Sequence, residues 1–397
     1  MSKTLLPLLI LSLVACCIEI DISVPGFPDM ARYFSVSDGM IQLTIAYNFL
    51  GFCLASVCYG PLSEAYGRRN VMVAGNALLL IGAALCVVAP NITLLLVARF
   101  IQGIGAATSA VVAFAMVADA YQGDKAVKFM GIMNSILTTL MAVAPVVGSF
   151  INEAVGWRGN YGIVALVCLI SWILLLLMLP ETRPTRERFS LSKVVADYKQ
   201  LLASRHFMSA SMVPSLLYAA YLTFVACGSF LYMETFGLSI IAYALHQGFI
   251  VATFSFVSIF VGRLIDKFGS QTCVNFGLTL VILGTLLLVA LSIVAPNSPY
   301  LMTAFMSVVA VGDAIVYAII FTASMEIFPG IRGTASSTIM AMRALVVSVA
   351  VGCISYLYDG QPLSVTLVML CILICTLGFF AMIRNQRTDT RNQEQEA

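Results

Sequence analysis

The stretch Gly60-Pro61-Leu62-Ser63-Glu64-Ala65-Tyr66-Gly67-Arg68-Arg69 decides the fold because it joins two apolar runs of membrane-spanning length. One glycine lets two helices approach closely, and the other allows the tight turn that reverses the chain. The acid before the turn and the arginines after it can bond helix ends. A related stretch, Gly262-Arg263-Leu264-Ile265-Asp266-Lys267-Phe268-Gly269, follows about 200 residues later. Two such copies indicate an internal repeat.

The composition is that of a membrane protein. Apolar residues make up 60% of the 397 residues and charged residues 10%, whereas a soluble domain is about half apolar and a quarter charged. The net charge of +2 gives no argument for nucleic acid. The eleven cysteines are scattered and form no Cys-x-x-Cys pair, so we predict no disulfide framework, no metal site and no cofactor.

Twelve apolar runs have the length that a bilayer requires. We expect spans at residues 5–24, 40–62, 70–89, 93–118, 128–150, 161–179, 207–230, 240–263, 271–294, 300–325, 334–357 and 362–383. This predicts an all-α membrane protein with twelve transmembrane helices in two pseudo-symmetric six-helix bundles, which is typical of secondary transporters. We expect an N-terminal bundle at 1–180, a cytoplasmic linker at 181–206, a C-terminal bundle at 207–383 and a polar cytoplasmic tail at 384–397. Nothing favours an oligomer, so we expect a monomer in the lipid bilayer.

The basic residues fix the expected orientation. With both termini inside, 17 of the 21 lysines and arginines lie in inner loops and tails. Arg32 and Arg158 lie in outer loops, and Arg99 and Arg343 lie within spans. This asymmetry predicts a multi-pass protein of the bacterial inner membrane with cytoplasmic termini.

Five charged residues lie inside the predicted spans, away from the span ends: Glu19, Asp21, Arg99, Asp313 and Arg343. Charge inside a membrane is costly, so each should face water or a partner. Glu19 and Asp21 lie about 200° apart around a helix and cannot face one cavity unless the helix unwinds. Arg99 lies at a similar depth, which is compatible with a contact between a carboxylate and Arg99. The alternative is that Arg99 is a structural anchor to helix ends. Asp313 and Arg343 also match in depth, and we predict that they pair, as a structural ion pair or at a transport site.

Other polar residues leave alternatives open. Tyr47 and Asn48 either line a substrate cavity or bond a neighbouring helix. Asp119 is expected to lie at a helix end, and His206 and His246 are expected as interfacial polar residues.

These residues carry a resemblance to a known family. The stretch 60–69 resembles the signature loop between helices two and three of the major facilitator superfamily, and 262–269 resembles its weaker copy between helices eight and nine. Arg99-Phe100-Ile101-Gln102-Gly103-Ile104-Gly105-Ala106-Ala107 resembles the helix-four motif, whose arginine is implicated in proton coupling. Ala144-Pro145-Val146-Val147-Gly148-Ser149 resembles the helix-five motif associated with antiporters.

Within the superfamily, the chain is similar to the bicyclomycin-resistance (Bcr/CflA) group of drug/proton antiporters. Asp21-Ile22-Ser23-Val24-Pro25-Gly26-Phe27-Pro28 resembles the end of helix one in that group, and the runs at 42–44, 156–158, 179–182 and 328–333 are also similar. Some positions depart from the family pattern. Glu64 stands where the signature usually has Asp, Ala65 where a basic residue is common, and Leu140, Ala144 and Ser149 replace glycines of the helix-five motif.

The resemblance implies a proton-coupled exporter that works by alternating access. Asp21, then Glu19, would carry the proton, because a low-dielectric cavity favours the neutral carboxyl, and movement of Arg99 would change that affinity. Tyr47, Asn48 and Asp313 are candidates for the substrate cavity. Structural or gating roles fall to Gly60, Glu64, Gly67, Arg68, Arg69, Pro145, Asp266, Lys267 and Arg343.

Two rival functions remain. A proton symporter importing a metabolite or a metal chelate such as a siderophore would use the same acids, and the altered helix-five motif keeps this alternative open. A membrane-embedded enzyme or sensor is disfavoured, because the sequence shows no histidine–acid cluster, activated serine or phosphate-binding loop. We therefore predict a transporter of small molecules and protons with no catalytic residues.

Overall fold

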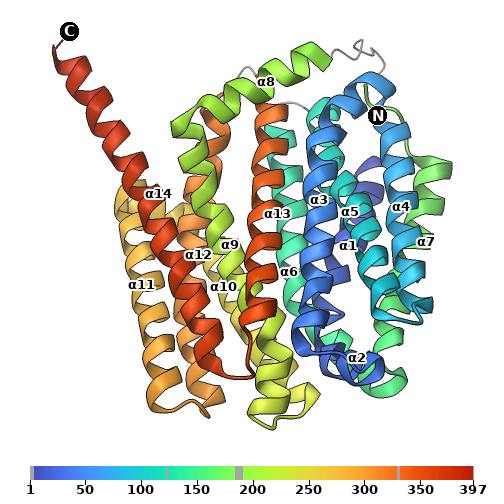
Figure 1. Ribbon diagram of the computed structural model, residues 1–397. Helices are drawn as coiled ribbons and strands as arrows, with labels where there is room; N and C mark the ends of the chain where they lie inside the picture. The colour runs from blue at the N-terminus through green and yellow to red at the C-terminus, as the bar shows by residue number, and fades with distance from the viewer. Residues whose placement is uncertain (1–3, 122–123, 184–190, 329–330, 397) are drawn as a thin grey trace.

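The structure, a computed structural model, describes residues 4–121, 124–183, 191–328 and 331–396. Helices fill most of these residues, and no strand occurs among them (Figure 1). In the described part, eleven helical stretches are long and apolar enough to cross a membrane, and α6 adds a shorter apolar stretch, Thr139–Val155. The predicted fold class is thus confirmed.

The first half of the chain folds into seven α-helices and a 3₁₀ turn. Their bounds are α1 Leu5–Asp21, η1 Val24–Gly26, α2 Phe27–Phe34, α3 Asp38–Tyr66, α4 Arg68–Val88, α5 Ile92–Ala120, α6 Asp124–Val155 and α7 Trp157–Met178. The first predicted span ends at residue 24, but the helical path continues to Phe34. Pro25 and Pro28 stand in the first turns of η1 and α2, where a missing amide hydrogen costs little.

The second half repeats this plan after a linker helix. Its elements are α8 Leu191–Ala203, α9 Arg205–Phe230, η2 Leu231–Thr235, α10 Ile240–Phe268, α11 Ser270–Val294, α12 Pro299–Glu326, α13 Arg332–Leu357 and α14 Pro362–Glu396. The predicted linker contains helix α8, and residues 184–190 lie outside the described part. Helix α14 continues through the predicted polar tail to Glu396 and extends beyond its neighbours (Figure 1).

Packing follows the sequence repeat. In the first half α5 packs on α3 and α4, and α4 packs on α7. In the second half α12 packs on α10 and α11, and α11 packs on α14, which are the equivalent pairs. The two halves meet mainly through α3 with α13 and through α6 with α10. The first of these seams is visible where red-orange α13 runs beside blue α3 (Figure 1).

The two copies of the repeated stretch turn the chain in the same way. Gly67 separates α3 from α4 with φ +94° and ψ 144°, and Gly269 separates α10 from α11 with φ +78° and ψ 150°. Only glycine adopts this backbone region readily. We call the end of the molecule that carries these two turns the signature end.

Candidate functional site

Two glycines bring α3 and α5 together beside α1. A Cβ atom at Gly103 would overlap the carbonyl of Asn48, and one at Gly51 would overlap the carbonyl of Phe100. This close approach lets the Asn48 side-chain amide donate to the Arg99 carbonyl oxygen at 3.2 Å. Asn48 is therefore fixed against the helix that carries Arg99.

Glu19 and Arg99 form a buried pair at this crossing. Arg99 Nη1 lies 3.4 Å from Glu19 Oε2, and their side chains are 0% and 1% exposed. Asn48 Nδ2 lies 3.2 Å from both Glu19 carboxylate oxygens, and Gln102 Oε1 accepts from Arg99 Nη1 at 2.8 Å. The guanidinium also lies 5.8 Å from the centre of the Tyr161 ring. The expected contact between a span-one carboxylate and Arg99 is thus made by Glu19.

Asp21 faces the other way, toward the second half. It is buried, and among the described residues its carboxylate makes no hydrogen bond or ion pair. It lies within electrostatic range of the hydroxyls of Tyr218 and Tyr221 on α9 and Tyr243 on α10. The two acids of α1 therefore have different surroundings, as their angular separation on the helix predicts.

An aromatic and polar wall from the second half stands opposite Asp21. The Tyr218 and Tyr221 rings lie 6.3 Å apart, and Gln247 Nε2 donates to the Tyr221 hydroxyl at 3.2 Å. Arg343 lies 4.9 Å from the centre of the Tyr218 ring and donates to the Tyr317 hydroxyl at 2.8 Å. Such a wall can bind apolar groups and cations through its ring faces.

The predicted pairing of Asp313 with Arg343 is wrong. Arg343 bonds Tyr317 instead, and Asp313 Oδ1 is buried without a hydrogen-bond partner in the described part. Asp313 and Tyr317 are four residues apart on α12 and share a face. The depth that the sequence predicted for the partner of Arg343 was therefore wrong by one helical turn, and Tyr317 stands where Asp313 was expected.

Tyr47 is not placed as a cavity residue. Its side chain is 39% exposed and lies in register with Leu54, which is 55% exposed, on the outward face of α3. Asn48, the next residue, is rotated by about 100° and is buried against Glu19. Of these two neighbours, only Asn48 contacts the candidate site.

The signature loop is held by a network within the first half. Arg68 Nε lies 2.9 Å from Asp119 Oδ2 at the end of α5, and Arg68 Nη2 lies 3.7 Å from Glu64 Oε1. The Glu181 carboxylate accepts from the backbone amides of Arg68 at 3.0 Å and Arg69 at 3.3 Å, which caps the start of α4. The sequence prediction missed Glu181 as a cap, although it lies in the conspicuous run Leu179-Pro180-Glu181-Thr182.

Arg69 and Gly60 make further contacts of the signature loop with other helices. The Arg69 guanidinium donates to the carbonyls of Leu176 and Leu179 at 2.8 Å each, so the loop is tied to the end of α7. A Cβ atom at Gly60 would lie 3.0 Å from Ser337 Oγ on α13. Gly60 is therefore at the seam between the halves.

The second copy of the loop does not brace the signature end as expected. Asp266 and Lys267 are exposed, and neither makes an ion pair within the described residues. Arg263 lies 5.5 Å from the Phe260 ring and Lys267 lies 5.1 Å from the Phe268 ring. Among the described residues, these two cations contact neighbouring rings and not a carboxylate of another helix end.

Helix α6 carries the predicted Pro145 at its contact with α1. Ser149 Oγ donates to the Pro145 carbonyl at 2.9 Å, and a Cβ atom at Gly148 would overlap the backbone of Ile22. Val146 lies against Gly248 of α10. The helix-five motif therefore lies between the end of α1 and the second half.

The end opposite the signature end is closed by contacts that the sequence did not reveal. Arg32 Nη1 lies 3.7 Å from Glu234 Oε1 in η2. Ser348 Oγ on α13 donates to the Ala46 carbonyl at 2.8 Å. A Cβ atom at Gly39 would overlap the Ser355 carbonyl, so α3 and α13 touch directly there.

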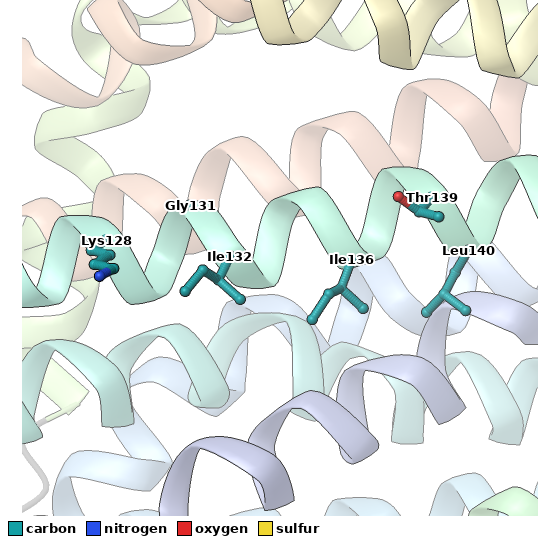
Figure 2. A pocket seen from close by; sticks show the side chains of 6 residues that line it. All are labelled: Lys128, Gly131, Ile132, Ile136, Thr139 and Leu140. Atoms are coloured by element: carbon teal, nitrogen blue, oxygen red, sulfur yellow. The ribbon is translucent and has the colours of Figure 1, made fainter.

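Surface hollows lie apart from the buried acids. Figure 2 shows one of about 530 Å³ that is lined by residues of α6 alone, with Ile132, Ile136 and Leu140 pointing to one side. It contains none of the predicted site residues. Among the described residues, no group of three or more His, Cys, Asp or Glu side chains is arranged to hold a metal ion.

Comparison with known proteins adds three relatives. The family model of the Major Facilitator Superfamily matches residues 9–351. The uncharacterized MFS-type transporter YdgK of Bacillus subtilis is 24% identical over 379 residues, covering 93% of this chain and 92% of that protein. The chloramphenicol resistance protein CraA of Acinetobacter baumannii is 24% identical over 340 residues, covering 85% and 82%. The multidrug resistance protein MdtL of Escherichia coli is 29% identical over 218 residues, so the match spans 55% of either chain.

Solved structures share the fold. A crystal structure of the D-xylose-proton symporter gives a TM-score of 0.77 at 16% identity, covering 95% of this chain and 97% of that one. An inward-facing structure of a bacterial homolog of the human lysosomal transporter Spinster gives 0.76 at 16% identity, covering 97% and 98%. The similarity to the bicyclomycin-resistance group stays a prediction.

Proposed function

The chain belongs to the Major Facilitator Superfamily and is a multi-pass membrane transporter, and from this premise we propose that it is a proton-coupled efflux antiporter for small amphipathic or drug-like compounds. The observation that carries the proposal is that the two acids of α1 have different surroundings. Glu19 is engaged by Arg99 and Asn48 within the first half, whereas Asp21 is buried, has no hydrogen-bond or ion-pair partner among the described residues, and faces the second half. The names of MdtL and CraA support a drug-like substrate by similarity.

Asp21 is the proposed proton carrier. A buried carboxylate without a hydrogen bond or countercharge is costly, so it is stabilised by taking up a proton or by a bound cation. The hydroxyls of Tyr218, Tyr221 and Tyr243 lie within electrostatic range of it, and aromatic side chains of this kind suit an amphipathic cation. Proton and substrate would then compete for one carboxylate, which is the requirement of an antiporter.

Alternating access would come from rocking of the two bundles about this site. We propose the bundles at 1–180 and 207–383 as the rigid units. The Arg68 network keeps the signature loop in the first unit. We place the signature end and both termini in the cytoplasm and the protein, as a monomer, in a bacterial inner membrane, because the basic residues concentrate on that side. The Arg32–Glu234 contact then closes the outer side.

The experiment reconstitutes the purified protein in vesicles with an imposed proton gradient and follows both an amphipathic cation and internal pH. Antiport predicts that vesicles with an acidic lumen lose protons as the compound enters. Asp266→Asn, at an exposed acid far along the chain from α1, is the matched control and should behave as wild type. Compound that enters only together with protons would contradict export.

Uptake by proton symport is the second candidate, because the helix-five motif departs from the antiporter pattern. Leu140, Ala144 and Ser149 replace its glycines. In that case a metabolite or a metal chelate such as a siderophore would bind together with the proton. Growth under challenge separates the candidates, since an exporter protects cells and an importer sensitises or feeds them.

A further inference from the structure

A surface groove of about 940 Å³ lies between the two halves, below helix α8. Its walls come from α3, α8 and α13, and include Cys53, Val57, Tyr198, Lys199, Ala341 and Leu345. Among the described residues that line it, Lys199 is the one charged residue, and the others are mostly apolar. Asp21 and Glu19 are not part of it, so the groove is separate from the candidate transport site.

The groove opens on the outer surface of the bundle. Leu345 on α13 is 47% exposed, and Leu202 and Val195 on α8 are 53% and 56% exposed. Leu345 belongs to a membrane-spanning helix, where an exposed apolar side chain faces lipid chains, and Leu202 and Val195 lie on the linker helix that borders this surface. The occupant of this groove therefore reaches it from the bilayer.

Helix α8 forms a fixed roof over the groove. Leu201 is fully buried in a cluster with Phe207 of α9 and Ile339 of α13, which fastens α8 to the second half. The Tyr198 hydroxyl donates to the Val57 carbonyl on α3 at 2.8 Å, which ties the same helix to the first half. Figure 1 shows α8 crossing above α13 at the end of the bundle. Lys199, next to Tyr198, is thereby placed at the membrane boundary.

We propose that this groove binds one anionic phospholipid of the leaflet on the α8 side. Its acyl chain lies against α3 and α13, and its phosphate pairs with Lys199. Charge complementarity supports this occupant, because an apolar groove with a single cation at its polar end matches a lipid with a negative head.

The dimensions agree with a chain in one leaflet. The groove residues of α3 run from Cys53 to Leu62. At 1.5 Å per residue, the part of α3 from Cys53 to Pro61 is about 12 Å long. One leaflet of a hydrocarbon core is about 15 Å thick. The cavity volume of about 940 Å³ also lies within the usual range of ligand sites.

The test is native mass spectrometry of the full-length protein after exchange into detergent with phosphatidylglycerol or with phosphatidylcholine of the same chains. Wild type should retain one phosphatidylglycerol in preference to phosphatidylcholine by about fivefold, and Lys199→Gln should lose that preference. Lys267→Gln, which removes an exposed cation at the signature end outside the groove, should leave it unchanged.

A second variant tests the apolar part of the groove. Ala341→Trp fills the groove and should lower retention of both lipids, while Lys199→Gln alters only the surface and keeps the test valid if the tryptophan variant folds poorly. Equal retention of both lipids by wild type, or unchanged phosphatidylglycerol retention in Lys199→Gln, would overturn the proposal. The proposal would also be overturned if a transported compound displaced phosphatidylglycerol to the same extent from wild type and from Lys199→Gln.

Discussion

At the scale of single residues, Arg99 is a fully buried charge whose hydrogen-bonding capacity is only partly used. Its Nη1 atom serves Glu19 and Gln102, while Nε and Nη2 are buried without a hydrogen-bond partner in the described part of the chain. A network that is only partly satisfied stores a cost that a change of partner can release. Arg99 is therefore suited to respond when Glu19 or α1 moves.

Removing one member of this pair should destabilise the protein strongly. Arg99→Ala leaves the Glu19 carboxylate buried without its countercharge, which costs about 3–5 kcal/mol of unfolding free energy. The double variant Glu19→Gln with Arg99→Ala should recover part of that loss, because no charge then remains. Thermal unfolding in detergent measures both. Strictly additive losses would show that the two side chains act independently.

A second cycle tests the corrected surroundings of Arg343. Arg343→Gln and Tyr317→Phe should be non-additive in unfolding free energy, because each removes the same hydrogen bond. Arg343→Gln and Asp313→Asn should add within about 0.5 kcal/mol, since these side chains do not meet. Recovery of stability in the Asp313 double variant would instead restore the ion pair expected from sequence.

Sequence reasoning reached some residue contacts and missed others for a definite reason. The angle between Glu19 and Asp21 follows from helix geometry, so their opposite directions could be predicted. Depth along a helix is known only to about one turn, which was enough to bring a carboxylate to Arg99 but not to distinguish Asp313 from Tyr317. The outward direction of Tyr47 depends on the rotation of α3, which the glycine contacts with α5 decide.

At the scale of elements, a glycine in a turn and a glycine on a helix surface should respond differently to substitution. Gly67→Ala should destabilise by about 1–3 kcal/mol, because φ +94° with ψ 144° is a region that side chains rarely adopt. Gly262 lies inside α10, and a Cβ atom there would meet nothing within 4 Å. Gly262→Ala should therefore be neutral or stabilising by up to about 1 kcal/mol.

Unfolding midpoints of these two variants give the comparison, and a Gly67→Ala variant as stable as Gly262→Ala would contradict it.

The apolar runs and the turn glycines are signals that a sequence shows directly. Helix α8 was not predicted because it is short and only partly apolar, and its position depends on contacts of Leu201 and Tyr198 with the adjacent helix α9 and with α13 and α3, which are distant in sequence.

At the scale of the whole molecule, the two halves touch through α3 with α13 and α6 with α10. These pairs are equivalent under the internal repeat, so neither half can rock without sliding along both seams. The Arg32–Glu234 contact joins the halves at the end opposite the signature loop, where both side chains are partly exposed. Exposed ion pairs contribute about 0–1 kcal/mol, which would suit a contact that opens and closes in the proposed rocking of the bundles.

Breaking the Arg32–Glu234 contact should change the fraction of molecules that are open at this end, and it should leave the free energy of unfolding nearly unchanged. Glu234→Gln should increase the fraction of molecules open at that end by up to about fivefold. Spin labels at Pro90 and Asn297, in a cysteine-free background, would report it as a longer distance by double electron–electron resonance. Glu153→Gln is the control, because Glu153 is an exposed carboxylate near the end of α6 that makes no ion pair within the described residues. An unchanged distance distribution in Glu234→Gln would exclude a gating role.

The most direct test of the central claim compares wild type with Asp21→Asn in reconstituted vesicles, in proton-driven transport and in substrate exchange without a gradient. The account predicts that Asp21→Asn loses proton-driven accumulation but retains exchange, because the neutral amide cannot release a proton while the bundles can still rock. Glu19→Gln should keep some response to the gradient. Full proton-driven accumulation by Asp21→Asn would contradict the assignment of Asp21 as the proton carrier.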